Sequence, residues 1–326
     1  MLAAVAALAG ASGGGGRALA ASTFRVCLVT GESGLYGPAA AAAVAGLASA
    51  GRTPAVAASR IETGSAAAFT AGLRSCVAAG ADLTIAAGFP AENAVDAVAT
   101  AFPKSSFAAI GVDVTTLTHR PRNVEGVLFA GEQAGYLAGY AAGRWARSVH
   151  GGTVGSVGGL DIPPVERVVA GFEDGAAKAA PGIRTIHAWA TGLGDAAACR
   201  RRALDELRHG AAVELAPGGS CGAGVAAAAA EKHAVSVAIG AGNVEPLSGA
   251  LLEVRLRFDV AVESAVAAAR AGRLRLGRNV FVGAAEGAVT VGPWGRRAPG
   301  WLRSAVDRQL ALLRAGRIHG IPVAVS

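Results

Sequence analysis

A glycine-rich turn follows an apolar run near the start of the chain, in the sequence VCLVTGESGLYG at residues 26–37. A strand, a turn of glycines and a helix together form the arrangement in which backbone N–H groups hold phosphate groups. The nucleotide-binding patterns GxGxxG and GxxxxGKS/T do not occur in the chain. The turn therefore predicts the rim of a ligand pocket better than the phosphate site of a nucleotide-dependent enzyme.

Other catalytic patterns fit no better. The TGxxxGxG turn of short-chain dehydrogenases needs glycine at the position of Leu35, and no Tyr-x-x-x-Lys pair follows. The six histidines are scattered, and no HExxH motif is present. We therefore expect no catalytic residue, no metal and no cofactor, and we interpret the chain as a binding protein rather than an enzyme.

The four cysteines, Cys27, Cys76, Cys199 and Cys221, are far apart in the sequence and form no CxxC pair. A zinc site is therefore disfavoured, because structural zinc sites draw on closely spaced cysteines. Cys27 falls in an expected strand and Cys76 in an expected helix, which favours small buried thiols. Disulfides in an oxidising compartment stay open as the alternative.

The formal net charge is +7, and the densest basic cluster is Arg200–Arg202. This cluster starts an amphipathic helical stretch that also holds Asp205 and Glu206. A nucleic-acid-binding surface would need a longer basic run or interleaved aromatic residues, and aromatic residues make up only 5% of the chain. We interpret the charge as scattered and solubilising, and we expect no nucleic-acid partner.

Residues 1–23 read as a leader rather than as part of a fold. The segment opens with about ten apolar residues, too few to span a bilayer. It is similar to the tail of a secretory signal, with Ala18-Leu19-Ala20 as the A-x-A cleavage candidate. A disordered leader is the alternative. We expect export, to the periplasm or to the extracellular face of the cell membrane.

Strand-like and helical stretches alternate after the leader. Runs that are apolar throughout predict parallel strands that helices cover on both faces. The series opens with a strand at 24–30, a helix at 38–51 with Pro38 in its first turn, and a strand at 53–59. A second series follows residues 123–131, and 326 residues suffice for two cores. The predicted fold class is α/β, with two lobes built on parallel sheets.

Glycine-containing turns recur where the expected strands end. The carboxyl ends of parallel strands share one edge of the sheet, and ligands bind at that edge. Glycine lets backbone amides approach a ligand, and the helix N-termini that follow favour polar or anionic groups. The turns are AAGFPAENAV at 86–95, IGVD at 110–113, VGGLD at 157–161, APGGSCGAGV at 216–225 and IGAGNVE at 239–245.

Several blocks occur in an order typical of one family: ADLTIAAGFPAENAV, NVEGVLFAGEQAGYLAGYAAG, VGSVGGLDIPPVERVVAGFEDGA and APGGSCGAGV. Over residues 24–310 the chain resembles the basic membrane protein family, the nucleoside-receptor lipoproteins of bacterial ABC importers. The resemblance implies a type I periplasmic-binding-protein fold, in which crossover hinge strands join two Rossmann-like lobes. It also implies a small-molecule ligand in the cleft, an ABC permease as partner, and a monomer.

The same resemblance implies that each lobe is discontinuous in sequence. The first lobe is expected to comprise residues 24–130 with 258–283. The second is expected to comprise residues 131–257 with 284–326.

The chain departs from the family's pattern at nucleoside-holding positions. Gly31 replaces an acidic residue after the first strand, and Ala39-Ala40 replace an aromatic–asparagine pair at the start of the first helix. Gly242 replaces the ribose-binding aspartate, and Arg257 replaces a lysine on a hinge strand. Each lost charged hydrogen bond costs about 1.5–3 kcal/mol. Either the ligand differs from the family's nucleosides or other residues substitute.

Arg257 is the foremost candidate, because an arginine on a hinge strand needs the ligand or a carboxylate such as Glu245 as partner. Tyr36 could stack on a planar ligand, with a cap on the core as the alternative. Phe89 matches a cleft aromatic, with core packing as the alternative. The predicted ligand-binding residues are Gly31, Glu32, Tyr36, Phe89, Asp113, Gly159, Asp161, Ser220, Asn243, Glu245 and Arg257.

The predicted function is the extracytoplasmic solute-binding component of an ABC importer, with a small polar, nucleoside-like ligand. Two alternatives stay open. One is a ligand-sensing regulatory protein of the same fold without a transport role. The other is a nucleotide-dependent α/β enzyme.

Overall fold

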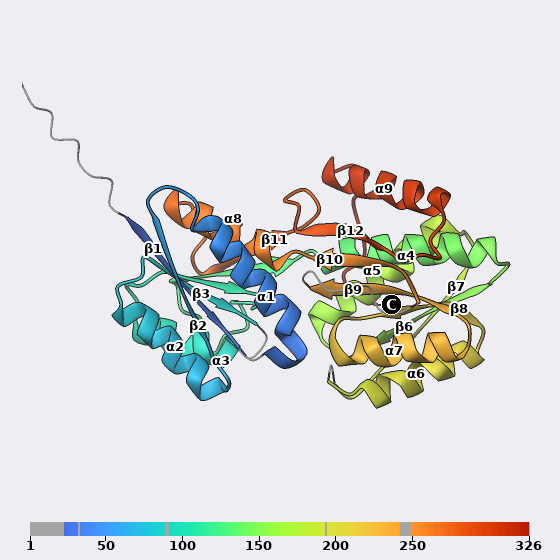
Figure 1. Ribbon diagram of the computed structural model, residues 1–326, viewed down its shortest axis with the longest axis horizontal. Helices are drawn as coiled ribbons and strands as arrows, with labels where there is room; N and C mark the ends of the chain where they lie inside the picture. Colours follow the sequence, from blue (N-terminus) through green and yellow to red (C-terminus); the bar gives the residue numbers. More distant parts are fainter. Residues whose placement is uncertain (1–22, 32, 89–90, 193, 242–248, 326) are drawn as a thin grey trace, which may run out of the picture.

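The computed structural model describes residues 23–31, 33–88, 91–192, 194–241 and 249–325, with only the backbone at 33–37. Within these residues, two α/β lobes lie side by side, and each is built on a six-stranded sheet (Figure 1). This confirms the predicted fold class. The order of strands is β11-β5-β4-β3-β1-β2 in the first sheet and β12-β10-β9-β8-β6-β7 in the second.

The first sheet is parallel at every pairing and is covered on both faces. Helices α1 and α8 pack on one face, and α2 and α3 pack on the other. Its strands are β1 (Phe24–Thr30), β2 (Val56–Glu62), β3 (Leu83–Ala87), β4 (Phe107–Ile110), β5 (Val124–Phe129) and β11 (Arg278–Val282). The helices are α1 (Ser33–Ala50), α2 (Ala66–Ala78), α3 (Ala91–Ala101) and α8 (Phe258–Arg270).

The second sheet repeats this plan, except that β12 runs antiparallel to β10. Helices α4, α5 and α9 lie on one side of it, and α6 and α7 lie on the other (Figure 1). Its strands are β6 (Thr153–Gly158), β7 (Arg184–Trp189), β8 (Ala211–Ala216), β9 (Val235–Ala241), β10 (Ala250–Leu256) and β12 (Val289–Trp294). The helices are α4 (Gly131–Ser148), α5 (Pro163–Ala179), α6 (Ala196–Arg208), α7 (Gly219–Glu231) and α9 (Gly300–Arg314).

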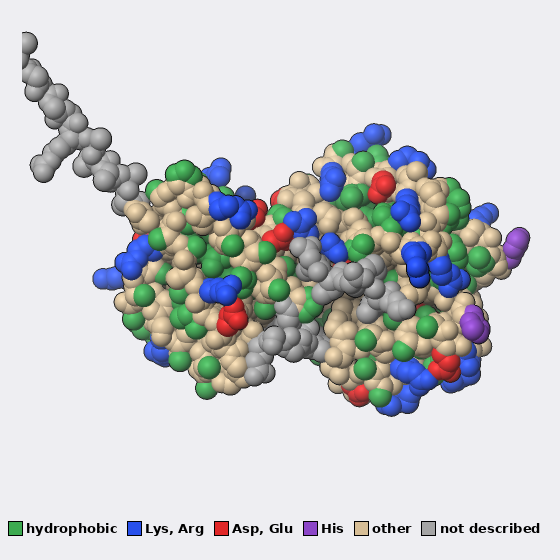
Figure 2. All heavy atoms as spheres, viewed as in Figure 1, with side chains coloured by type: hydrophobic (Ala, Val, Ile, Leu, Met, Phe, Trp, Pro, Cys, Tyr) green, Lys and Arg blue, Asp and Glu red, His purple; other side chains and the backbone are tan. Residues whose placement is uncertain are grey.

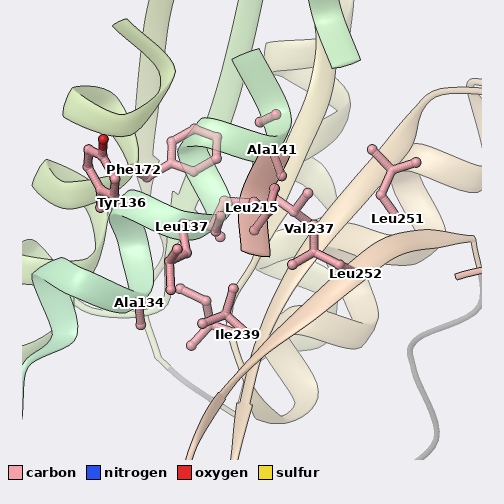
Figure 3. Close-up of a cluster of buried hydrophobic side chains, with 14 of the residues drawn as sticks. Ala134, Tyr136, Leu137, Ala141, Phe172, Leu215, Val237, Ile239, Leu251 and Leu252 are labelled. Atoms are coloured by element: carbon pink, nitrogen blue, oxygen red, sulfur yellow. The ribbon is translucent and has the colours of Figure 1, made fainter. Parts of the chain in front are cut away.

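The largest core cluster lies between α4, α5 and α9 and the second sheet. Leu137 and Phe172 from the helices pack toward Leu215, Val237 and Leu252 from the strands (Figure 3). These side chains are at most 1% exposed. The central strands β8, β9 and β10 are therefore buried on this face, as their uninterrupted apolar sequences predict.

Two predicted element boundaries were wrong. Helix α1 begins at Ser33, so Pro38 lies inside the helix and not in its first turn. The proline removes only the bond to the carbonyl of Gly34, close to the helix end, where the loss is tolerated. Strand β2 begins at Val56 and is mostly exposed, because it is an edge strand.

Helices α4 and α5 approach each other closely along a row of glycines. Gly135, Gly139 and Gly143 follow one face of α4, and Gly171 and Gly175 lie opposite them on α5. A Cβ added at any of these positions would overlap backbone or side-chain atoms of the other helix. The absence of side chains therefore sets the distance between the two helices.

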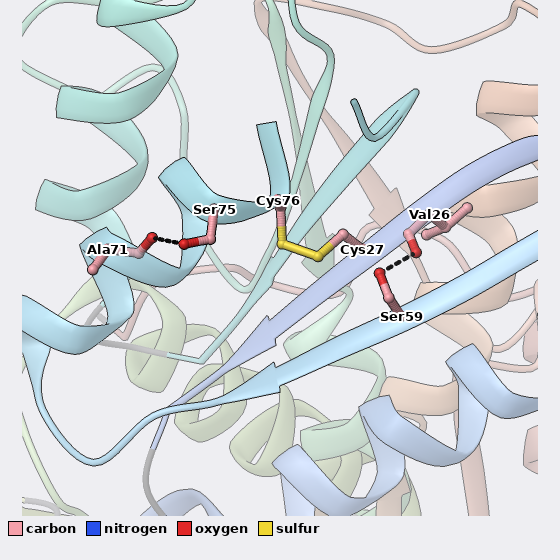
Figure 4. The surroundings of a disulfide bond; sticks show 6 residues. All are labelled: Val26, Cys27, Ser59, Ala71, Ser75 and Cys76. Atoms are coloured by element: carbon pink, nitrogen blue, oxygen red, sulfur yellow. Dashed lines mark hydrogen bonds between the residues drawn. A yellow bond between two sulfur atoms is a disulfide. The ribbon is translucent and has the colours of Figure 1, made fainter. Parts of the chain in front are cut away.

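Both pairs of cysteines form disulfides, so the interpretation as free buried thiols was wrong. Cys27 of β1 is bonded to Cys76 of α2 (Figure 4). Cys199 of α6 is bonded to Cys221 of α7. The Cα atoms lie 5.6 and 5.2 Å apart. Each lobe thus has one covalent link between packed elements, as is typical of proteins in oxidising compartments.

Removing the first disulfide should weaken the first lobe. The Cys27–Cys76 bond closes a loop with a sequence separation of 49. We expect the double variant Cys27→Ala/Cys76→Ala to lose about 2 kcal/mol of unfolding free energy, the low end of the usual range. Urea unfolding followed by circular dichroism measures this difference. The difference should shrink when both proteins are reduced, and equal stabilities under oxidising conditions would contradict it.

Two carboxylic acids are buried against each other beneath α6. Glu206 of α6 and Glu214 of β8 are 5% and 0% exposed. Their carboxyl oxygens lack a hydrogen-bond partner among the described residues. A Cβ added at Gly155 would lie 2.5 Å from Glu206 Oε2 and 2.6 Å from Glu214 Oε1, so the two groups meet above this glycine. Burial raises the pKa of both acids, and repulsion by Glu214 raises that of Glu206 further.

Candidate ligand-binding site

Each sheet has one position where the chain reverses its direction of winding. The strand order places this switch between β1 and β3 in the first sheet and between β6 and β8 in the second. Open α/β sheets bind ligands beyond the carboxyl ends of the strands at such a switch. The two switch points are therefore the candidate ligand-binding site.

Glycines occupy the strand ends at both switch points. Gly31 follows β1 and Gly88 follows β3, while Gly159 and Gly218 follow β6 and β8. Gly88 has a φ of 125°, which only glycine adopts readily. At Gly31 a Cβ would meet only a ring atom of Phe69, at 3.9 Å. The backbone of Gly31 is therefore open to a ligand, although the same space could also accept a side chain.

The two switch points face a common region. Helix α1 begins at the carboxyl end of β1 and contacts α7 and β9 of the second lobe. Helix α7 itself begins directly after β8. The carboxyl edges of both sheets are thus brought toward each other across the junction between the lobes.

The connections between the lobes are bonded to one another. The chain crosses from β5 to α4, from β10 to α8 and from β11 to β12. Ala130 N donates to Val282 O at 2.9 Å, and Arg257 N donates to Ala288 O at 2.8 Å. These crossovers form the hinge that was expected between the lobes.

Asp113, after β4, has a defined set of hydrogen-bond donors. Thr115 N and Oγ1 donate to its Oδ1 at 2.8 and 2.6 Å, and Asn279 Nδ2 of β11 donates at 2.6 Å. Burial alone would raise the pKa of Asp113. The hydrogen bonds from Thr115 and Asn279 and the charge of Arg167 outweigh it, so its pKa lies below the ordinary value. Asp113 is therefore a fixed anion at the junction and not a freely solvated turn acid.

Arg167 of α5 links the two lobes, and the sequence did not single it out. Its Nη1 lies 3.2 Å from Glu132 Oε2, and its guanidinium lies 5.0 Å from the ring centre of Phe281 on β11. Its charge also acts on Asp113 of the first lobe. No local motif marks Arg167, because its partners come from distant parts of the chain.

Arg257 pairs with the carboxylate of Asp259, whereas the sequence suggested Glu245 as a partner. It lies just after β10, and its Nε and Nη2 contact Asp259 Oδ1 and Oδ2 at 2.8 and 2.5 Å. This bond to Asp259 raises the pKa of Arg257. The guanidinium is thus engaged at the start of α8, which lowers its availability to a ligand.

Asp161, Gly159 and Ser220 lie at the second switch point. Asp161 is exposed after β6, Gly159 is buried, and Ser220 is in the first turn of α7. The sequence GGSCG at 218–222 also fits the GxSxG spacing of a nucleophile elbow. The histidine rings that form side-chain hydrogen bonds among the described residues, His119, His187 and His209, contact Asp96, Glu173 and the carbonyl of Asp205.

The remaining candidates lie outside the described structure in whole or in part. Glu32, Phe89, Asn243 and Glu245 fall outside the described residues, as does Gly242. The backbone of Tyr36 lies in the first turn of α1. Ala39 and Ala40 lie one turn further on, so their assignment to the helix start was wrong.

Within the described ranges, no group of three or more histidine, cysteine, aspartate or glutamate residues is arranged to hold a metal ion. None of the helices in the described part of the chain has the length and apolar character needed to cross a membrane. Among the described residues, the strand ends offer backbone amides, Asp113, Asp161 and Ser220 as polar groups. They can hold a polar organic ligand by hydrogen bonds.

Curated relatives match parts of the chain. An uncharacterised lipoprotein of Pyrococcus horikoshii is 31% identical over 136 residues, which cover 40% of this chain and 33% of that protein. The ABC transporter nucleoside-binding protein BmpA of Lactococcus lactis is 29% identical over 164 residues, covering 50% of this chain and 45% of that protein. Matches to the first relatives thus span about a third of their length.

Solved structures match nearly the whole chain. An ABC transporter solute-binding protein of Aeropyrum pernix aligns with a TM-score of 0.68 and 20% identity, covering 91% of this chain and 93% of that one. A transcriptional activator of the comK gene from Bacillus halodurans aligns with a TM-score of 0.71 and 18% identity, covering 89% and 97%. At these identities the likeness establishes the type I periplasmic-binding-protein fold alone.

A family model settles the wider assignment. The model for the Bmp family, described as ABC transporter substrate-binding protein PnrA-like, matches residues 47–245. This segment includes the second switch point and, of the first, β3 and Gly88, while β1 and Gly31 precede it. The chain therefore belongs to the Bmp family of ABC transporter substrate-binding proteins.

Proposed function

We propose that the protein is the exported solute-binding component of an ABC importer. The carrying observation is the pair of glycine-lined switch points on two hinged lobes. A ligand between them contacts both lobes, so binding favours a closed arrangement. The closed form would dock on an ABC permease, as a monomer and without catalysing a reaction.

The proposed lobes are residues 24–130 with 258–283, and 131–257 with 284–326. Every strand of the first sheet falls in the first set, and every strand of the second sheet falls in the second set. This agreement supports the boundaries.

The proposed ligand is a small polar, nucleoside-like molecule. The name of the Lactococcus lactis relative supports this choice. Tyr36 is part of the proposed site, since an aromatic ring can stack on a planar base. Asp161 and Ser220 offer hydrogen-bonding groups at the second, where a ribose could bind. The candidates outside the described residues, Glu32, Phe89, Asn243 and Glu245, remain part of the proposed site.

A thermal-shift assay of the purified protein against nucleosides, nucleobases and free sugars tests this function. A nucleoside at 100 times its dissociation constant should add about 2.7 kcal/mol of stability. Asp161→Ala should weaken the nucleoside shift severalfold, because one hydrogen bond to the ligand is lost. Asp307→Ala, an exposed acid on α9, is the matched control and should leave the shift unchanged.

The outcomes separate the parts of the proposal. A shift with sugars or bases alone would retain the transport function and replace the nucleoside. No shift with any member of the panel would contradict the proposed binding of a nucleoside-like solute.

A further inference from the structure

Arginine and tryptophan side chains gather on the outer side of the second lobe, where α4, β12 and α9 meet. The set, called here the arginine–tryptophan surface, comprises Arg144, Trp145, Trp294, Arg297, Trp301 and Arg303. It holds three of the four tryptophans of the chain. Neither the switch points nor the hinge uses any of these residues.

Two of the contacts connect α4 to the segment around α9. The guanidinium carbon of Arg144 lies 5.6 Å from the ring centre of Trp301, and that of Arg297 lies 5.9 Å from the ring of Trp145. Both arginines are exposed, and Trp301 is 43% exposed. Cation–π contacts of this kind hold a guanidinium in place without using its N–H groups.

The third contact fixes the edge of the surface. The guanidinium carbon of Arg303 lies 5.8 Å from the ring centre of Trp294 on β12. Its Nε and Nη2 donate to the carbonyls of Ala298 and Gly295 at 3.2 and 3.4 Å. This arginine is a structural support, whereas Arg144 and the exposed Trp301 face solvent.

The charge around this surface is predominantly positive. Residues 294–319 contain six arginines and one acid, Asp307. Arg308 and Arg314 are exposed on α9. In Figure 2, basic side chains gather over α9 at the top of this lobe, and a second group lies around α6 at its lower edge. This second group, called here the α6 group, comprises Arg200, Arg201, Arg202 and Arg208. Helix α6 contains no tryptophan, which makes the α6 group a useful comparison.

We propose that the arginine–tryptophan surface docks on an anionic phospholipid bilayer. The exposed arginines are spread over the outside of α4 and α9. A partner that matches them must therefore present many negative groups on a broad face. Phosphate groups of lipids match guanidinium groups by paired, charge-assisted hydrogen bonds. Exposed tryptophan adds affinity at the headgroup level, where its ring is buried and its N–H stays hydrated.

The presence of tryptophan beside arginine favours a bilayer over an acidic polypeptide as the partner. Charge complementarity alone would also be served by Arg201 and Arg202 of the α6 group, which contains no tryptophan. Trp301 and Val149, which follows the last turn of α4, are 43% and 49% exposed and supply apolar area that a bilayer interface can bury. Docking by this face would hold the second lobe at the membrane independently of any ligand between the lobes.

Sedimentation with vesicles tests the proposal. Vesicles of phosphatidylcholine alone are compared with vesicles of equal parts phosphatidylcholine and phosphatidylglycerol, at low and high salt. The protein should bind the anionic vesicles, and binding should fall as salt increases. The double variant Arg144→Glu/Arg308→Glu should bind about tenfold more weakly or worse.

The α6 group provides the matched control. Arg201→Glu/Arg202→Glu changes the formal charge by the same amount at exposed positions of the same lobe. It should retain most of the binding. Trp301→Ala leaves the charge unchanged and should weaken binding severalfold, with the thermal midpoint recorded to show that each variant folds.

Three results would overturn the proposal. One is no binding to anionic vesicles at low salt. Another is an equal loss in both double variants, which would indicate diffuse attraction by net charge. The third is binding to polyglutamate but not to vesicles, lost in Arg144→Glu/Arg308→Glu, which would assign the surface to an acidic polypeptide.

Discussion

Replacing Gly139 with alanine is expected to lower the free energy of unfolding by about 3 kcal/mol or more, at the upper end of overpacking effects. The new Cβ would overlap the carbonyl oxygen of Phe172 and lie 2.8 Å from its Cα. Both are backbone atoms, so no side-chain rotation can relieve the overlap. The helices α4 and α5 would have to separate, and the core between them and the second sheet would lose contacts.

Gly300→Ala is the matched control. A Cβ at this position, in the first turn of α9, meets no atom within 4 Å. Alanine is the better helix former, so the variant should be as stable as the parent or slightly more stable. Urea unfolding followed by circular dichroism compares the three proteins. A Gly139→Ala variant as stable as Gly300→Ala would show that the glycine row does not set the helix spacing.

The sequence predicted most elements because their signals are local. Buried parallel strands such as β3 and β4 are short apolar runs, and the helices between them show the expected period. The exceptions have physical reasons. Strand β2 has the composition of a buried strand but lies at the sheet edge, and an internal proline hid the true start of α1.

The candidate site was predictable where it depends on topology. Alternating strands and helices predict a parallel sheet whose strands end at one common edge, so the glycine turns at that edge could be located. The pairing of Arg257 with Asp259 depends on two residues two positions apart, and the sequence contained this signal. Arg167 could not be found, since its contact with Phe281 and the effect of its charge on the pKa of Asp113 exist only after the lobes assemble.

The disulfides and the buried acids show a different limit. Four cysteines allow three pairings, and only the packing of α2 on β1 and of α6 on α7 selects one. Glu206 belongs to a charged amphipathic helix, and Glu214 interrupts an apolar strand. Neither of these sequence patterns indicates that the carboxyl groups of Glu206 and Glu214 lie next to each other.

The double variant Glu206→Gln/Glu214→Gln should be markedly more stable than the parent above neutral pH. Unfolded glutamates ionise near their ordinary pKa of 4.5. In the folded protein burial raises the pKa of both acids, so the folded state retains protons that the unfolded state releases. The free energy of unfolding of the parent must then fall as pH rises through the interval between these values.

The size of the effect follows from the number of protons retained. One proton held only by the folded state lowers stability by about 1.4 kcal/mol per pH unit. Between about pH 5 and about pH 7.5 a single proton therefore accounts for about 3 kcal/mol. Glutamine keeps the shape and carries no proton to lose, so the variant should lack this slope. Thermal and urea unfolding at several pH values measure the slope in each protein.

Glu62→Gln distinguishes the buried pair from a general effect of removing acids. Glu62 is at the exposed edge strand β2, and its side chain is 62% exposed beside Arg60. An exposed ion pair contributes at most about 1 kcal/mol, so this variant should keep the parent's dependence on pH. If the double glutamine variant also kept the parent's slope, the retained proton would not lie on Glu206 or Glu214. The loss of stability with rising pH would then have to come from other groups, and the close approach of these two acids above Gly155 would have no thermodynamic consequence.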